Sequence, residues 1–126
     1  MATIELTKEN LITMINQNDT VLVDFWAPWC GPCRQFAPVL ESMSESHPDI
    51  IFGKVNSEEQ QELAGHFQVR SIPTLTIFRQ EIIVFSQPGA LPPAGLESII
   101  EKVAALDMDE VRRQVAEQAQ EQGGSA

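Results

Sequence analysis

Trp29-Cys30-Gly31-Pro32-Cys33 contains both cysteines of the chain, separated by two residues. An apolar run, Val21 to Trp26, precedes this stretch, and a segment with apolar side chains at helical spacing follows it. Two thiols at this spacing can close a small disulfide ring and open it again. We therefore predict a redox-active dithiol at the junction between a strand and a helix.

The apolar periodicity on both sides of the cysteine pair predicts alternating strands and helices, with Thr7 and Ser57 as N-caps of two of the helices. This order predicts an α/β fold with a mixed central sheet of about five strands flanked by about four helices. The predicted strands are 3–6, 21–26, 50–56, 74–78 and 82–85, and the predicted helices are 8–15, 32–46, 57–66 and 93–106.

The composition changes after Leu106, which divides the chain into a domain over 1–106 and an acidic, Glu/Gln-rich extension over 107–126. Asp107 and Glu110 have the spacing of a helix capping box. One narrow apolar stripe accompanies them: Met108, Val111 and Val115. We expect a helical extension or tail with a disordered end from about Gly123.

The net charge of -10 argues against nucleic acid as a partner, because backbone phosphates would be repelled. The acidity favours solubility, with selection among charged protein partners as the alternative. No secretory signal or membrane helix is expected, and we expect a cytoplasmic protein. Thiols are kept reduced in that compartment, so an isolated cysteine pair favours catalysis over a permanent crosslink.

The position of the cysteines favours thiolate chemistry. Cys30 falls at the start of a helix, where free N–H groups and the helix dipole stabilise negative charge. Pro32 suits the first helical turn, and Cys33 is predicted to be the less exposed, resolving sulfur. A zinc site would need two further ligands, and His47 and His66 are isolated in the sequence, so no metal is expected.

Two segments carry a family resemblance. Phe25 to Arg34, with Ala37-Pro38 following, resembles the active-site segment of thioredoxins, and Ser71-Ile72-Pro73-Thr74-Leu75 resembles the family's segment with a cis-proline. The resemblance extends over 1–106. It implies the thioredoxin fold, reduction of protein disulfides without a bound cofactor, and a monomer recharged by a thioredoxin reductase.

The resemblance also implies roles for individual residues. Cys30 would be the nucleophile and Cys33 the resolving thiol, while Gly31-Pro32 favours a strongly reducing couple. The docking surface for substrate would consist of Trp29, Ile72, Pro73, Gly89 and Ala90. Trp26 is expected in the core.

Asp24 is the unusual residue of its strand. A carboxyl group among Val, Leu, Phe and Trp is costly to ionise, which suits a proton acceptor for Cys33. The alternative is an Asp at a strand end that reaches solvent. Lys54 matches the family's lysine near this carboxylate and would modulate its charge, unless it is an ordinary exposed lysine.

Three segments depart from the family pattern. Asn56 stands where many relatives carry Asp, Arg79-Gln80-Glu81 lacks the common turn glycine, and Gln87-Pro88 precedes Gly89. These differences concern the hairpin geometry and the choice of partner rather than the dithiol. The leading hypothesis is a thiol–disulfide oxidoreductase, and the alternative is a binding or chaperone-like module whose tail recruits a partner.

Overall fold

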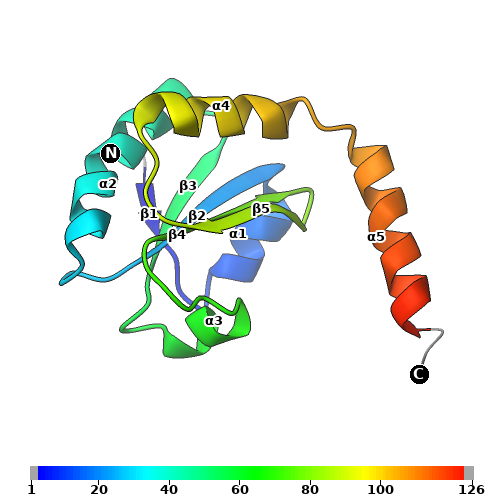
Figure 1. Ribbon diagram of the computed structural model, residues 1–126, viewed down its shortest axis with the longest axis horizontal. Coiled ribbons are helices and arrows are strands. Elements are labelled where there is room, and N and C mark those ends of the chain that lie inside the picture. Colours follow the sequence, from blue (N-terminus) through cyan, green and yellow to red (C-terminus); the bar gives the residue numbers. More distant parts are fainter. Residues whose placement is uncertain (1–2, 124–126) are drawn as a thin grey trace.

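The computed structural model describes the backbone of residues 3–123 and the side chains of residues 3–120. A single five-stranded sheet, in the order β1-β3-β2-β4-β5, forms the centre of the molecule (Figure 1). The elements in chain order are β1 (Thr3–Glu5), α1 (Leu11–Gln17), β2 (Thr20–Trp26), α2 (Gly31–Ser46), β3 (Ile51–Asn56), α3 (Gln61–His66), β4 (Thr74–Arg79), β5 (Ile82–Pro88), α4 (Pro93–Ala104) and α5 (Met108–Gly123). The predicted mixed sheet and its helices are confirmed.

Two apolar cores lie on opposite faces of the sheet. On one face α2 and α4 pack against the sheet, with Phe36 and Ile100 buried beside Leu22. On the other face α1 packs against alternate residues of the same strand, and Leu11 is buried beside Val23. Because side chains alternate along a strand, β2 contributes to both cores and is buried on both faces.

The hairpin between β4 and β5 forms without a turn glycine. Gln80 and Glu81 both have positive φ, 51° and 70°, the conformation of the two-residue turns that match strand twist. The N–H of Gln80 donates to the carbonyl of Asp19 at 2.7 Å, which fixes the turn against the start of β2. Gln87 and Pro88 pair with Leu75 and Thr74 as the end of β5, so they are part of the ladder.

Two helices begin later than the sequence indicated. The stretch from Lys8 to Asn10 is a turn, and α1 starts at Leu11, whose N–H donates to the Thr7 carbonyl. Ser57 does not cap α3. The Asn56 carboxamide oxygen accepts from the N–H groups of Glu58 and Glu59 in a separate turn, so a short polar side chain organised the chain outside the helix.

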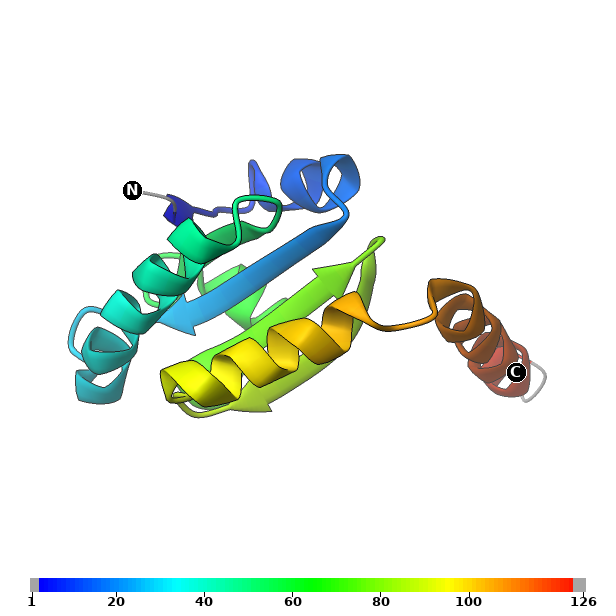
Figure 2. The same cartoon turned by 90° about the horizontal axis from the view of Figure 1, so that it is seen from above.

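The extension forms a helix of its own. In Figures 1 and 2, α5 lies beyond the end of α4, to the side of the sheet. The Asp107 carboxylate accepts from the N–H groups of Asp109 and Glu110, and Met108 is buried. The Glu110 side chain pairs with Arg113, so the capping box is only half formed. Residues 124–126, part of the end expected to be disordered, lie outside the described residues. Within residues 3–123, no helix is long and apolar enough to cross a membrane.

Gly53 is the position in β3 where the strands leave no room for a side chain. A Cβ there would lie 2.1 Å from Cδ1 of Leu6, which is fully buried and cannot move aside freely. We expect Gly53→Ala to lower the free energy of unfolding by about 1–3 kcal/mol in chemical denaturation. Gly65→Ala, on open helix surface, is the control and should leave the stability unchanged or raise it slightly, because Ala favours the helix more than Gly does. Equal stability of the two variants would contradict the packing described here.

Candidate active site

Cys30 and Cys33 form a disulfide at the beginning of α2, with their Cα atoms 5.3 Å apart. Cys30 is the N-cap residue, and its Sγ accepts a hydrogen bond from the N–H of Cys33 at 3.2 Å. Pro32 occupies the first helical turn. In the reduced protein the same N–H would stabilise a Cys30 thiolate, because it is one of the donors that a helix N-terminus leaves unpaired.

The two sulfur-bearing residues differ in accessibility. Cys30 is 5% exposed and Cys33 is 1% exposed, so an external sulfur atom can reach Cys30 more easily. Both lie in a small apolar cluster with Ala27, against which Trp26 and Ile72 pack. Trp26 is therefore half-buried next to the cysteines rather than fully within a core.

The loop before β4 lies directly against the disulfide. The Ile72–Pro73 peptide bond is cis, and the carbonyl of Ile72 lies 3.8 Å from Cys30 Sγ. The Pro73 carbonyl accepts from the N–H of Gly89 at 2.7 Å, which joins the end of β5 to the same loop. Gly89 has φ +101°, a conformation that other residues rarely adopt. Ala90, the next residue, is exposed.

Trp29 stands out from the surface beside the cysteines. Its side chain is 67% exposed, and the indole N–H donates to Glu58 at 3.0 Å. The hydrogen bond holds one edge of the ring while leaving the other free for contact with a bound chain. Nothing in the sequence pattern singled out Glu58, because its partner lies 29 residues away.

Asp24 is fully buried in β2, and neither oxygen of its carboxyl group has a hydrogen-bond partner among the residues that the structure describes. Burial raises the pKa of Asp24 to about 7, and the positive charge of Lys54 opposes the rise. The two residues are direct partners in the parallel pairing of β2 with β3. The Lys54 ammonium also lies 4.4 Å from the centre of the Trp26 ring, a cation–π contact that holds it at the site.

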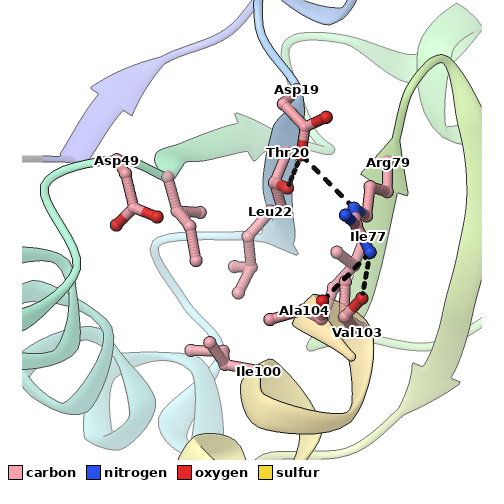
Figure 3. Close-up of a pocket in the computed structure, with 10 residues that line it drawn as sticks. Asp19, Thr20, Leu22, Asp49, Ile77, Arg79, Ile100, Val103 and Ala104 are labelled. Atoms are coloured by element: carbon pink, nitrogen blue, oxygen red, sulfur yellow. Dashed lines mark hydrogen bonds and ion pairs between the residues drawn. The ribbon is translucent and has the colours of Figure 1, made fainter. Parts of the chain in front are cut away.

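A separate cavity of about 160 Å³ lies at the other end of β2 (Figure 3). Arg79 lies at this cavity, where its guanidinium donates to the carbonyls of Val103 and Ala104 and pairs with Asp19. These contacts tie the end of α4 to β4 and β2. The contacts of Arg79 beside this cavity therefore stabilise a helix junction away from the cysteines.

The two histidines have partners of their own. His47 Nε2 lies 2.6 Å from Glu97 Oε2, and the His66 ring packs edge-on against Phe67. Among the residues that the structure describes, no group of three or more His, Cys, Asp or Glu side chains could hold a metal ion.

Comparison with known proteins identifies the family of the chain. The thioredoxin family model matches residues 2–102. A putative thioredoxin 2 of Streptomyces coelicolor is 55% identical over 122 residues, covering 97% of this chain and 91% of the relative. A thioredoxin of Alicyclobacillus acidocaldarius is 44% identical over 98 residues, covering 77% of this chain and 93% of the relative.

Solved structures give the same result for the fold. The Plasmodium falciparum thioredoxin superimposes with a TM-score of 0.73 at 33% identity, covering 79% of this chain and 97% of that one. A mutant thioredoxin from Halobacterium salinarum gives a TM-score of 0.76 at 32% identity, covering 82% of this chain and 92% of that one. With its paired cysteines and these relatives, the chain belongs to the thioredoxin family of protein-disulfide oxidoreductases.

Proposed function

We propose that Cys30 is the nucleophile of this oxidoreductase and that Cys33 is the resolving thiol. The observation that carries the assignment is the position of Cys30: the N-cap of α2, more exposed than Cys33 and in contact with the cis-proline loop. Gly31 and Pro32 leave the helix N-terminus open above the sulfur, since neither adds a bulky side chain there.

The reaction exchanges one disulfide for another. The Cys30 thiolate attacks a substrate disulfide, forms a mixed disulfide and releases one substrate sulfur as a thiolate, which takes up a proton. Cys33 loses its proton and attacks Cys30 Sγ, which releases the second substrate thiol and closes the Cys30–Cys33 disulfide. A thioredoxin reductase, which the family implies as a partner, returns two electrons and two protons.

Asp24 is proposed as the acceptor of the Cys33 proton, with Lys54 as a modulator. A pKa near 7 leaves the carboxyl group about half ionised at neutral pH, so it can take up and release a proton there. The absence of a hydrogen bond to either oxygen favours this role, because no protein donor fixes the ionised form.

Trp29, Ile72, Pro73, Gly89 and Ala90 are proposed as the docking surface for substrate. The cis bond and the Gly89 contact bring two loops to one edge of the disulfide. The exposed indole of Trp29 supplies an apolar surface on the other side. An extended substrate chain could pair with the free backbone groups of this loop.

We further propose that residues 1–106 form the catalytic domain and 107–126 an accessory extension of a monomeric, cytoplasmic protein. The Streptomyces relative aligns over 97% of the chain, whereas the Alicyclobacillus thioredoxin covers 77%. The alternative function, a module whose tail recruits a partner, is favoured by the exposed Val115 on α5, which stands to the side of the sheet.

Replacement of each cysteine by serine tests the assignment of the two thiols. Cys30→Ser should abolish the reduction of insulin, whereas Cys33→Ser should still attack and accumulate mixed disulfides, because the resolving thiol is missing. Mixed disulfides can be counted by non-reducing electrophoresis and mass spectrometry. Normal turnover by Cys33→Ser, or equal trapping by both variants, would show that the assignment is wrong.

Replacement of Asp24 tests its burial and its role together. Between pH 4 and 7 the folded state keeps a proton that the unfolded chain has lost, so ionisation of Asp24 costs stability as the pH rises. Asp24→Asn should therefore raise the free energy of unfolding by roughly 2–4 kcal/mol at pH 8 and by little near pH 4. It should also slow the reduction of insulin.

Asp49→Asn provides the matched control, because it removes the same charge from an exposed position. Its stability should follow the parent at both pH values when chemical denaturation is measured. An Asp24→Asn protein that is no more stable than the parent at pH 8 would contradict the buried carboxyl group.

Truncation after Leu106 tests the proposed division of the chain. Insulin reduction should remain near the level of the full chain, because every proposed site residue lies upstream. Loss of the buried Met108 should lower the free energy of unfolding by about 1–3 kcal/mol. If the truncated protein stays folded by circular dichroism but loses most of its activity, the binding-module alternative gains precedence.

A further inference from the structure

A groove of about 240 Å³ with polar and apolar lining lies next to the cis-proline loop, between the end of α3 and the end of β5. Its walls carry donors from both sides: Gln68, Arg70, Ser71, Ser86 and Gln87. None of these residues is part of the proposed redox chemistry or of the proposed docking surface. The groove is therefore a feature of the surface that the proposed reaction does not use.

Arg70 is a free cation at this groove. Its side chain is exposed, and within residues 3–120 it makes no ion pair or side-chain hydrogen bond. The other arginines all have partners. Arg34 donates to the Pro28 carbonyl, Arg79 pairs with Asp19, Arg112 with Asp109, and Arg113 with Glu110. Arg70 thus keeps a planar set of donors that fits a carboxylate.

The backbone before Arg70 is well defined. Gln68 has φ 58°, and its N–H donates to the Gly65 carbonyl, while the N–H of Val69 donates to the Ala64 carbonyl. This pair of bonds ends α3 in the way a Schellman motif does. The Thr74 hydroxyl then donates to the Ser71 carbonyl at 2.6 Å. The chain is held on both sides of Arg70.

A substrate chain bound at the cysteines would pass close to the groove. Arg70 is two residues from Ile72, whose carbonyl lies 3.8 Å from Cys30 Sγ. An extended chain advances about 3.3 Å per residue, so a side chain about two to four residues from the attacked cysteine can reach the groove.

Charges near the beginning of α3 have the other sign. Glu58 holds the Trp29 indole, and together with Glu9, Glu59 and Glu62 it lines a second groove, whose only cation among the described residues, Lys8, pairs with Glu62. An acidic substrate side chain would be repelled there and attracted to Arg70. The chain as a whole is acidic, with a net charge of -10, so any preference for an acidic side chain must come from a local contact.

We propose that the groove at Arg70 is a specificity subsite, which binds an Asp or Glu side chain of the substrate near its target disulfide. The carboxylate is bound by the Arg70 guanidinium, with Gln68 and Ser71 as neighbouring donors. The subsite rests on the proposed docking of substrate at Ile72 and Pro73. Binding there sets the direction in which the substrate chain crosses the active site.

Symmetric peptide disulfides can test the subsite, because attack on either sulfur then gives the same product. Peptides that differ only by Glu, Gln or Lys at one position, two to four residues on either side of the cysteine, are mixed with the dithiol form of the full chain. The second-order rate constant of reduction is measured at low and high ionic strength. Arg70→Gln is compared with the parent and with Lys102→Gln, which removes the same charge from α4.

For the parent we expect the Glu peptide to react about three- to tenfold faster than the Gln peptide at one of the tested positions. This ratio should fall at high ionic strength. The Lys peptide should react most slowly. Arg70→Gln should lose this preference while reducing the Gln peptide at the parental rate, and Lys102→Gln should keep it. Arg70→Lys should restore part of it, since charge is kept without the planar donors.

A preference that survives in Arg70→Gln, or that Lys102→Gln also loses, would overturn the subsite. So would equal rates for the Glu and Gln peptides in the parent, and that result would leave the proposed roles of the cysteines intact. Failure of the parent to reduce even the Gln peptide would instead overturn the proposed docking, and the subsite with it.

Discussion

Pairing of β2 on both edges is the constraint on which the rest of the structure depends. This strand pairs parallel with β3 and antiparallel with β4, and its two faces contribute to two different cores. Its backbone has no edge open to solvent, so it cannot shift without breaking both ladders. The turn that carries the cysteines follows β2 directly, so its position is fixed by the strand. Asp24 is held in the same strand and is fully buried there, among the apolar neighbours that the strand places on both faces of the sheet.

Antiparallel pairing explains why distant segments meet at the cysteines. The end of β2 lies beside the start of β4, where Phe25 pairs with Thr74, and Thr74 pairs in turn with Pro88 at the end of β5. The cysteine turn, the cis-proline loop and Gly89 therefore lie at one end of the sheet. At the opposite end of the sheet, Arg79 joins the end of α4 to the strands and so stabilises the fold.

Charge is distributed unevenly around the site, although the chain is acidic overall. Glu58, before α3, binds the Trp29 indole, while Arg70, after α3, has no partner among the described side chains. Most other cations are used to anchor the fold, as Arg79 does at α4 and Arg112 and Arg113 do along α5. An arginine left unpaired beside a reactive loop is therefore informative, because electrostatic complementarity mainly affects which partner binds and in which orientation.

The sequence by itself determined the α/β class, the mixed sheet and the cysteine pair, because these depend on local periodicity and on residues adjacent in the chain. It misplaced the starts of α1 and α3, where Thr7 and Asn56 organise turns before the helices. Only the tertiary structure decided the pKa of Asp24, the contact of Ile72 with Cys30, the Glu58 bond to Trp29 and the lack of a partner for Arg70 among the described side chains. Each depends on burial or on residues far apart in the chain, and neither is encoded in local spacing.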